Sequence, residues 1–168
     1  RIEVYDNSHL QGSHAIGAMV VAGREGFIRS QYRKFSIKDD SISLGDDAHM
    51  MYHVLTRRFA RLKNNDTKFS SSYPDLILID GGLTQVKSAA KVLSDMDLED
   101  IHVIGVAKGV ERNAGKEELY FVNRPRLMLK HKDPILFFIQ RLLSHELYLR
   151  RSIYIAWKKY SCGSNPLK

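Results

Sequence analysis

Leu76-Ile77-Leu78-Ile79-Asp80-Gly81-Gly82 is the stretch of this 168-residue chain that decides its fold. Four consecutive aliphatic residues bounded by turn residues predict a strand buried on both faces, near the centre of a parallel or mixed sheet. The acid stands where that strand ends, and the glycines permit a tight exit and the close approach of a ligand. In open α/β sheets, ligands bind at the carboxyl ends of strands. Asp80 is therefore a candidate functional carboxylate, although a turn or a helix cap would have the same sequence.

The composition is that of a globular protein with room for one α/β domain. It is 43% hydrophobic and 27% charged, with no run long enough to cross a membrane and no signal-peptide pattern. The single Cys162 excludes an intrachain disulfide framework and a cysteine-based zinc site. The near absence of cysteine favours a cytoplasmic setting, and the chain begins inside a strand-like segment without Met, which predicts a piece of a longer protein.

The net charge of +7 is unevenly distributed along the chain. Basic residues gather in three clusters: Arg57, Arg58, Arg61 and Lys63; Arg124, Arg126, Lys130 and Lys132; and Arg150, Arg151, Lys158 and Lys159. A basic surface favours a polyanionic partner, most often nucleic acid. The alternative is a solvated basic face that binds nothing specific.

Periodicity predicts a mixed sheet flanked by helices. Strands are expected at 2–5, 15–22 and 31–37 as an antiparallel meander, then at 76–79, 102–106, 119–122 and 127–129, with helices at 46–63, at 85–96 and after Asp133. We expect residues 7–9 to turn the chain after the first strand and residues 23–26 to form a hairpin turn. In the last helix, Ile135, Phe138, Ile139 and Leu142 are expected to face inward.

Two further acids occupy positions comparable to that of Asp80. Asp6 ends the predicted first strand, and Asp47 shares the apolar face of the helix predicted at 46–63. If the first strand pairs in parallel with the strand at 76–79, Asp6 and Asp80 become neighbours and the helix brings Asp47 above them. Clustered carboxylates repel one another unless they hold cations, and hard oxygen ligands favour Mg²⁺ or Mn²⁺. Two such ions about 3.5–4 Å apart can clamp the oxygens of a phosphodiester, as in ribonuclease H-like nucleases.

The amino-acid sequences of several segments are specific to one family of such nucleases. In chain order they are Arg1-Ile2-Glu3-Val4-Tyr5-Asp6-Asn7-Ser8-His9-Leu10-Gln11-Gly12, Tyr32-Arg33-Lys34-Phe35, Gly45-Asp46-Asp47, Arg57-Arg58-Phe59, 74–82 with Gln85, Val103-Ile104-Gly105-Val106-Ala107-Lys108 and Gln140-Arg141. Over residues 1–141 the chain resembles the C-terminal endonuclease domain of the UvrC family of excinucleases. The resemblance implies an α/β, ribonuclease H-like fold with a mixed five-stranded sheet flanked by helices.

The resemblance also implies a function. The family's metal-binding aspartates fall on Asp6, Asp47 and Asp80, and its reaction needs Mg²⁺ or Mn²⁺ and a metal-activated water. The expected substrate is damaged double-stranded DNA held by the partner protein UvrB, cut on the 5′ side of the lesion in the bacterial cytoplasm. No membrane and no small-molecule substrate are expected. Arg57, Arg58 and Lys108 are candidates for phosphate contacts, with surface solvation as the rival explanation.

The resemblance weakens after Arg141. The family's catalytic His would fall on Leu147, and His145 stands two positions earlier, so a shift of register would be needed to present it to the site. A partly buried helical His is the alternative for His145. Compensating frameshifts or local decay over 142–160 would explain the departure and predict weak nuclease activity. We expect one domain over 1–160 and the start of a linker over 161–168, with the family's other nuclease, its UvrB-binding segment and its helix-hairpin-helix pair outside this chain.

Two other functions remain open on the sequence. One is a related nuclease of the endonuclease V type, which would share the fold. The other is a catalytically silent DNA-binding fragment, which the displaced His favours. A Rossmann dehydrogenase is disfavoured because no Gly-x-Gly-x-x-Gly follows the first strand.

Overall fold

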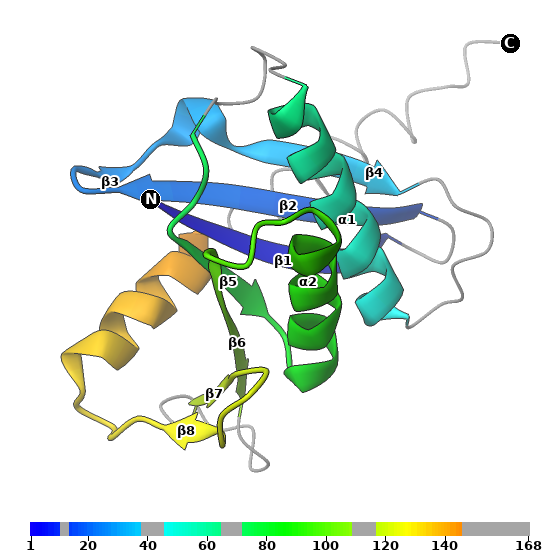
Figure 1. Cartoon of the computed structure of the whole chain (residues 1–168). Helices are drawn as coiled ribbons and strands as arrows, with labels where there is room; N and C mark the ends of the chain where they lie inside the picture. Colours follow the sequence, from blue (N-terminus) through cyan, green and yellow to red (C-terminus); the bar gives the residue numbers. More distant parts are fainter. Residues whose placement is uncertain (11–13, 38–45, 65–71, 109–116, 146–168) are drawn as a thin grey trace, which may run out of the picture.

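The fold was obtained as a computed structural model that describes residues 1–10, 14–37, 46–64, 72–108 and 117–145 (Figure 1). It is a mixed sheet in the order β3-β2-β1-β5-β6-β7-β8, with β4 also paired to β2. The elements are β1 (Ile2–Leu10), β2 (His14–Gly23), β3 (Gly26–Phe27), a 3₁₀ turn (Arg29–Gln31), β4 (Arg33–Ile37), α1 (Asp47–Lys63), β5 (Leu76–Asp80), α2 (Leu83–Asp95), β6 (His102–Lys108), β7 (Glu117–Tyr120) and β8 (Leu127–Met128), followed by a helix over 134–145.

The α/β class and the flanking helices are confirmed, but the sheet has eight strands rather than five. The strand expected at 127–129 is present as β8, whereas the two-residue strand β3 was not expected. The strand expected at 31–37 begins at Arg33, because Arg29–Gln31 forms a 3₁₀ turn between β3 and β4. A two-residue strand such as β3 carries too little periodicity to be recognised in a sequence.

The first strand is longer than expected. Residues 7–9 do not turn the chain, because β1 continues to Leu10 and pairs antiparallel with β2 from Ile2↔Ala22 to Leu10↔His14. Asp6 therefore lies within a strand and not at its end. Three consecutive polar residues favour a turn at Asn7-Ser8-His9, but Asn7 and Ser8 are only partly buried, and a strand tolerates polar residues at such positions.

The central parallel arrangement is confirmed. β5 lies between β1 and β6 and runs parallel to both, with Tyr5↔Ile79 as the last pair on one side and Asp80↔Val106 on the other. The aliphatic run of β5 is buried on both faces, as Ile77, Leu78 and Ile79 are at most 1% exposed. Its carboxyl end thus lies at the middle of the sheet.

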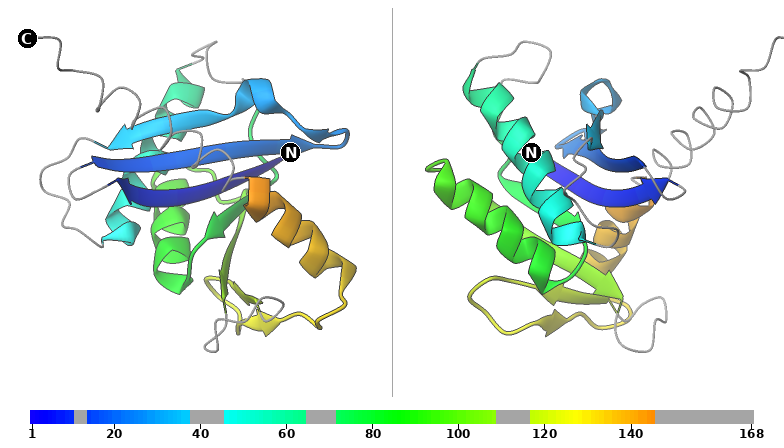
Figure 2. Two further views of the ribbon diagram at one scale, coloured as in Figure 1. Left: turned by 180° about the vertical axis from the view of Figure 1, so that it is seen from behind. Right: turned by 90° about the vertical axis from the view of Figure 1, so that its right-hand side faces the viewer.

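Helices cover both faces of the sheet, as the right-hand view of Figure 2 shows. On one face α1 and α2 pack on Tyr5, Met19 and Ile79 through apolar residues at helical spacing, among them Met51, Val54, Ala89 and Val92. α1 begins at Asp47, because the Asp46 carboxylate accepts a hydrogen bond from the His49 backbone N–H and caps the helix.

Helix 134–145 covers the opposite face. Its buried residues are Leu136, Ile139 and Leu142, and the last two pack with Val4, Val20 and Leu78. The inward orientation of Ile139 and Leu142 is confirmed, but Ile135 and Phe138 are 57% and 50% exposed. Residues 135–139 are all apolar, so periodicity cannot distinguish the correct face from one rotated by a single residue.

Within the described ranges, none of the helices combines the length and the apolar character needed to span a membrane.

Candidate active site

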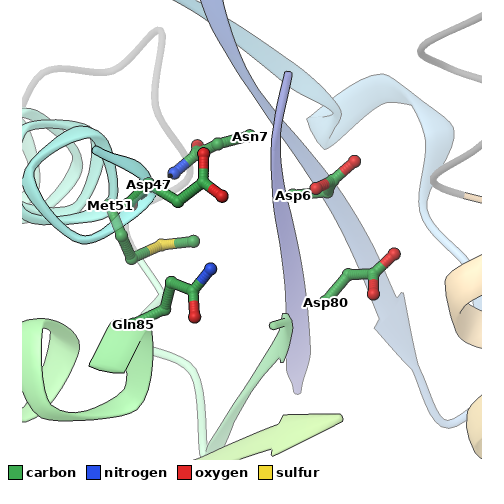
Figure 3. Close-up of a pocket in the computed structure, with 6 residues that line it drawn as sticks. All are labelled: Asp6, Asn7, Asp47, Met51, Asp80 and Gln85. Atoms are coloured by element: carbon green, nitrogen blue, oxygen red, sulfur yellow. Dashed lines mark hydrogen bonds between the residues drawn. The ribbon is translucent and has the colours of Figure 1, made fainter. Parts of the chain in front are cut away.

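One pocket brings together the three acids singled out by the sequence (Figure 3). It lies at the carboxyl end of the parallel strands and is lined by Asp6, Asn7, Asp47, Met51, Asp80 and Gln85. The lining residues come from β1, α1, β5 and α2, and none of these six described residues is basic. The pocket is therefore an acidic, oxygen-rich site in a chain whose net charge is positive.

Asp6 and Asp80 lie side by side on one face of the sheet. Each is the residue after the last parallel pair, Tyr5↔Ile79, between β1 and β5. Two residues earlier, Val4 and Leu78 pack in the core beneath helix 134–145. Because strand side chains alternate between faces, Asp6 and Asp80 point toward that same face, and Figure 3 shows them on one side of β1. Asp6 is only 7% exposed, so water screens this carboxylate poorly.

Asp47 forms the other wall of the pocket. It is the first residue of α1, and Figure 3 shows it across β1 from Asp6 and Asp80, beside Asn7, Met51 and Gln85. Asn7 connects this wall to the strand, because its Nδ2 donates to the Asp47 carbonyl at 3.4 Å. The Asn7 Oδ1 is buried and accepts no hydrogen bond from any described residue. Sequence reasoning missed Asn7 as a pocket residue, because its polar neighbours favoured a turn.

The glycines after Asp80 lie against Gln85, which lines the pocket. Gln85 folds back so that its Oε1 accepts the Gly82 backbone N–H at 2.9 Å and caps α2. A Cβ on Gly81 would lie 2.8 Å from the Gln85 Cδ, so a larger residue would displace this side chain. The Gly81-Gly82 pair thus serves the start of α2 as well as leaving space beside Asp80.

The donor set suits a hard divalent cation, but the three carboxylates do not converge on one point. Across the described residues, no three His, Cys, Asp or Glu side chains are placed to hold a single ion. The pair Asp6 and Asp80 supplies two oxygen donors on one face, and Asp47 faces them from the opposite wall. Carboxylate oxygens are the ligands that Mg²⁺ and Mn²⁺ prefer, and a cation between two adjacent carboxylates would relieve their repulsion. The residues fit such an ion in chemistry, with Asp6 and Asp80 as the pair already in place.

The structure does not bring His145 to this pocket. Its ring stacks on Phe27 with centroids 3.7 Å apart, and its Nδ1 lies 3.0 Å from the Tyr32 hydroxyl. Phe27 pairs with Ala22, which stands opposite Ile2, and Ile2 is four residues from Asp6, or about 13 Å along the strand. Burial, followed by the charges of Arg29 and Arg141, lowers the pKa of His145 below its usual 6.5. The partly buried helical His is the alternative that fits this position, and Leu147 lies outside the described residues.

Arg58 is a structural residue, so its expected phosphate contact is corrected. Its side chain is 1% exposed, and its Nη2 donates to Glu3 Oε1 at 2.7 Å. Glu3 also accepts from the Tyr5 hydroxyl at 2.5 Å and from Arg1 Nη2 at 2.9 Å. Burial lowers the pKa of Arg58, but the hydrogen bond to Glu3 and the charge of Glu3 outweigh burial, so that the pKa is raised. For the Tyr5 hydroxyl, burial and then the charge of Glu3 raise the pKa well above 10. No phosphate can reach a guanidinium held in this way.

Arg57 and Lys108 remain candidates for phosphate contacts. Arg57 donates to the Ser36 carbonyl and lies 5.9 Å from the centroid of the Phe35 ring. Lys108 ends β6, is exposed, and stands two residues beyond Val106, the partner of Asp80. Residues two apart on a strand share a face, so Lys108 projects on the side of Asp6 and Asp80.

Comparison with known protein families gives one match over most of the chain. Residues 1–145 match the UvrC RNAse H endonuclease domain. The UvrABC system protein C of Jannaschia sp. (strain CCS1) is 53% identical over 168 residues, which is 99% of this chain and 27% of that protein. That of Rhodospirillum rubrum is 50% identical over 143 residues, covering 84% of this chain and 22% of its own length. The chain therefore spans about a quarter of the length of these relatives.

Solved structures of low similarity were also found. Human ENDOV has a TM-score of 0.48 at 19% identity, covering 67% of this chain and 50% of its own. Ciona intestinalis endonuclease V, in a complex with a 24mer DNA containing an inosine, has a TM-score of 0.45 at 18% identity, covering 65% and 46% of the two chains.

Proposed function

The chain belongs to the UvrC RNase H endonuclease domain family, and on this premise we propose that it hydrolyses a phosphodiester bond of damaged double-stranded DNA on the 5′ side of the lesion. The reaction would use Mg²⁺ or Mn²⁺ and would take place in the bacterial cytoplasm, within a UvrABC nucleotide excision repair system. The partner protein UvrB would hold the damaged DNA, through segments of the full-length protein outside this chain.

The observation that carries the proposal is that Asp6, Asp47 and Asp80 all line one pocket. They come from three elements that are far apart in the sequence, and no basic side chain stands among the described residues that line the pocket with them. In open α/β sheets the carboxyl end of parallel strands is where ligands bind.

Four of the pocket residues, together with Lys108, have roles in this proposal. Asp6 and Asp80 would hold the cation, and Asp47 would supply a further carboxylate from the opposite wall. When bound, the ion would lower the pKa of a coordinated water and neutralise charge on the scissile phosphate. Lys108 would hold a neighbouring DNA phosphate, and Asn7 would fix the Asp47 backbone through its hydrogen bond to that carbonyl. The core side chains beneath Asp6 exclude water, and a bound cation would stabilise the charge of its carboxylate there.

The test is metal-dependent nicking of a duplex that carries one bulky lesion. It is measured in two reactions, one with UvrA and UvrB present and one in which Mn²⁺ is the only addition. We expect Asp6→Asn, Asp47→Asn and Asp80→Asn each to reduce nicking at least about a hundredfold while the protein remains folded. Asp100→Asn, at an exposed position outside the pocket, is the matched control and should retain the wild-type rate. Calorimetric titration with Mn²⁺ provides a second readout, and unchanged binding in Asp6→Asn and Asp80→Asn would refute the proposed site.

A catalytically silent DNA-binding fragment is the second candidate function. The observation in its favour is the placement of His145, which packs against Phe27 and Tyr32 and does not line the pocket. This candidate predicts DNA binding without nicking in the wild type. Leu147→His then tests the role of the displaced His: an increase in nicking supports weak activity caused by its loss, and a wild type with full activity contradicts it.

A further inference from the structure

The hairpin and the first turn of helix 134–145 expose an unusual number of apolar side chains. Leu127 and Met128 on β8 are 49% and 56% exposed, and Ile135, Phe137 and Phe138 on the helix are 57%, 56% and 50% exposed. Single exposed apolar residues are ordinary, but several within one short segment mark an interaction surface. We call residues 122–138 the hairpin–helix surface.

The same segment is strongly basic. It contains Arg124, Arg126, Lys130 and Lys132, and its only acid is Asp133. Asp133 has a local role, because its carboxylate accepts the Ile135 backbone N–H at the start of the helix. Arg126 reaches back to Glu118 at 3.0 Å, although its own side chain remains 61% exposed. Positive charge is therefore interspersed with exposed aromatic and aliphatic side chains.

The surface belongs to the same side of the molecule as the acidic pair. Helix 134–145 packs through its inner residues on the face toward which Asp6 and Asp80 point. Gln140 Nε2 of this helix donates to Glu117 Oε1 of β7 at 2.8 Å, which joins the helix to the strand next to β8. Glu117 pairs with Lys108, which lies two residues beyond the partner of Asp80. A continuous path of described residues thus leads from the pocket to the hairpin–helix surface.

We propose that the hairpin–helix surface binds DNA whose bases are unstacked, with Phe137 and Phe138 stacking on exposed bases and the four basic residues contacting phosphates. This inference rests on the proposed function, because it assigns the type of DNA that the nuclease engages. Aromatic side chains stack on any unpaired base, and interspersed Lys and Arg side chains follow the backbone. A base inside an intact duplex offers its face to no side chain, so exposed Phe residues select distorted DNA.

Charge decides between DNA and another occupant. A second copy of the chain would place two surfaces of the same sign against each other, and mutual repulsion would oppose that contact. DNA carries one negative charge per about 1.7 Å of duplex axis and complements a segment with four basic residues and one acid. An acidic protein partner would satisfy the charge as well, and it is separated from DNA by the following experiment.

The experiment measures DNA binding by fluorescence anisotropy in EDTA, with the full chain, so that it does not depend on catalysis. The probes are a duplex of about 30 base pairs, which is long enough to span the surface, and the same duplex with a central unpaired bubble. We expect the wild type to prefer the bubble, and Phe137→Ala/Phe138→Ala to lose about ten- to hundredfold in bubble affinity with little change for the intact duplex. Phe137→Tyr/Phe138→Tyr keeps the aromatic faces and should retain the preference. Lys130→Ala/Lys132→Ala should weaken both complexes and lower the salt dependence by about two counterions.

Equal bubble affinity in the wild type and the Phe137→Ala/Phe138→Ala variant would overturn the inference. Sedimentation showing a wild-type dimer that this variant dissolves, without a change in DNA affinity, would also overturn it and assign the surface to a second copy. Thermal unfolding of each variant shows whether the fold is retained, which is expected because both rings are at least half exposed. Nicking by the wild type is assayed separately, so a failure of the nuclease proposal and a failure of base stacking give different results.

Discussion

Arg58 should be required for stability and not for DNA binding, and the substitution Arg58→Met tests this directly. Arg58 and Glu3 are 1% and 0% exposed, and their shortest contact is 2.7 Å. Met fills much of the same volume but leaves the Glu3 carboxylate buried without its main cation. Removing one partner of a buried ion pair costs about 3–5 kcal/mol of unfolding free energy. For a chain of this size that corresponds to a decrease of roughly 6–20 °C in melting temperature.

The assay is chemical denaturation followed by circular dichroism, with Arg57→Met as the matched control. Arg57 is adjacent in sequence, but it is not buried and contacts Ser36 and the Phe35 ring, so its loss should cost about 1 kcal/mol or less. Adding Glu3→Gln to Arg58→Met removes the uncompensated charge. The double variant should then lose less than the sum of the single losses, by about 0.5–3 kcal/mol.

Two results would refute this reasoning. A loss below about 1 kcal/mol in Arg58→Met would show that the pair is not buried as described. A folded Arg58→Met protein of near-normal stability that binds DNA much more weakly would restore Arg58 as a phosphate contact. Anisotropy with an intact duplex, measured well below the melting temperature of the variant, separates the two roles.

Three further outcomes are expected. The pKa of His145 should lie below 6.5 in a ring-proton NMR titration, because burial favours its neutral form. The stability linked to this residue is then fully present above about pH 6.5 and is lost as the pH falls through the folded-state pKa. When the pH is lowered from about 7.5 to about 5.5, His145→Phe should therefore lose less stability than the wild type. Gly105→Ala should destabilise the fold by about 1–3 kcal/mol in chemical denaturation, because its Cβ would lie 2.5 Å from Val86 Cγ2 and 2.7 Å from the Gly81 backbone oxygen. Gly23→Ala is the control and should cost less, because its Cβ would meet only the end of the Ile28 side chain, at 3.1 Å. Lys108→Ala should weaken duplex binding uniformly across sequences and reduce the salt slope by about one counterion, and an unchanged slope would remove Lys108 from the phosphate contacts.

The central sheet could be predicted from the sequence because β5 leaves little choice. A strand with Ile77, Leu78 and Ile79 in a row needs cover on both faces, which only a central position with helices on each side provides. The position of Asp80 followed from that strand, and the parallel pairing of β1 with β5 placed Asp6 beside it. The end of β1 was not predicted in the same way, because β1 continues to Leu10 through the residues expected to form a turn.

Where the pattern admitted several solutions, tertiary contacts decided. Arg58 falls within a basic cluster, and nothing local indicates that Glu3, 55 residues away, neutralises it in the core. Helix 134–145 carries five consecutive apolar residues near its start, so its buried stripe is set by the shape of the sheet beneath it. His145 lies at the end of the same helix, and its contact with Phe27 follows from that rotation and from the 3₁₀ turn that places Tyr32.

The position of Asp6 inside β1 explains why the pocket forms where it does. Parallel pairing with β5 stops at Tyr5, while antiparallel pairing with β2 continues to Leu10, beyond Asp6. β1 therefore extends past the carboxyl end of β5 and presents Asp6 next to Asp80, with the following Asn7 turned to the opposite face toward Asp47. A strand that ended at Asp6 would leave its carboxylate on a loop, exposed to water and free to turn away. Continued pairing holds Asp6 at 7% exposure beside a second acid, and this is the arrangement on which the proposed cation site rests.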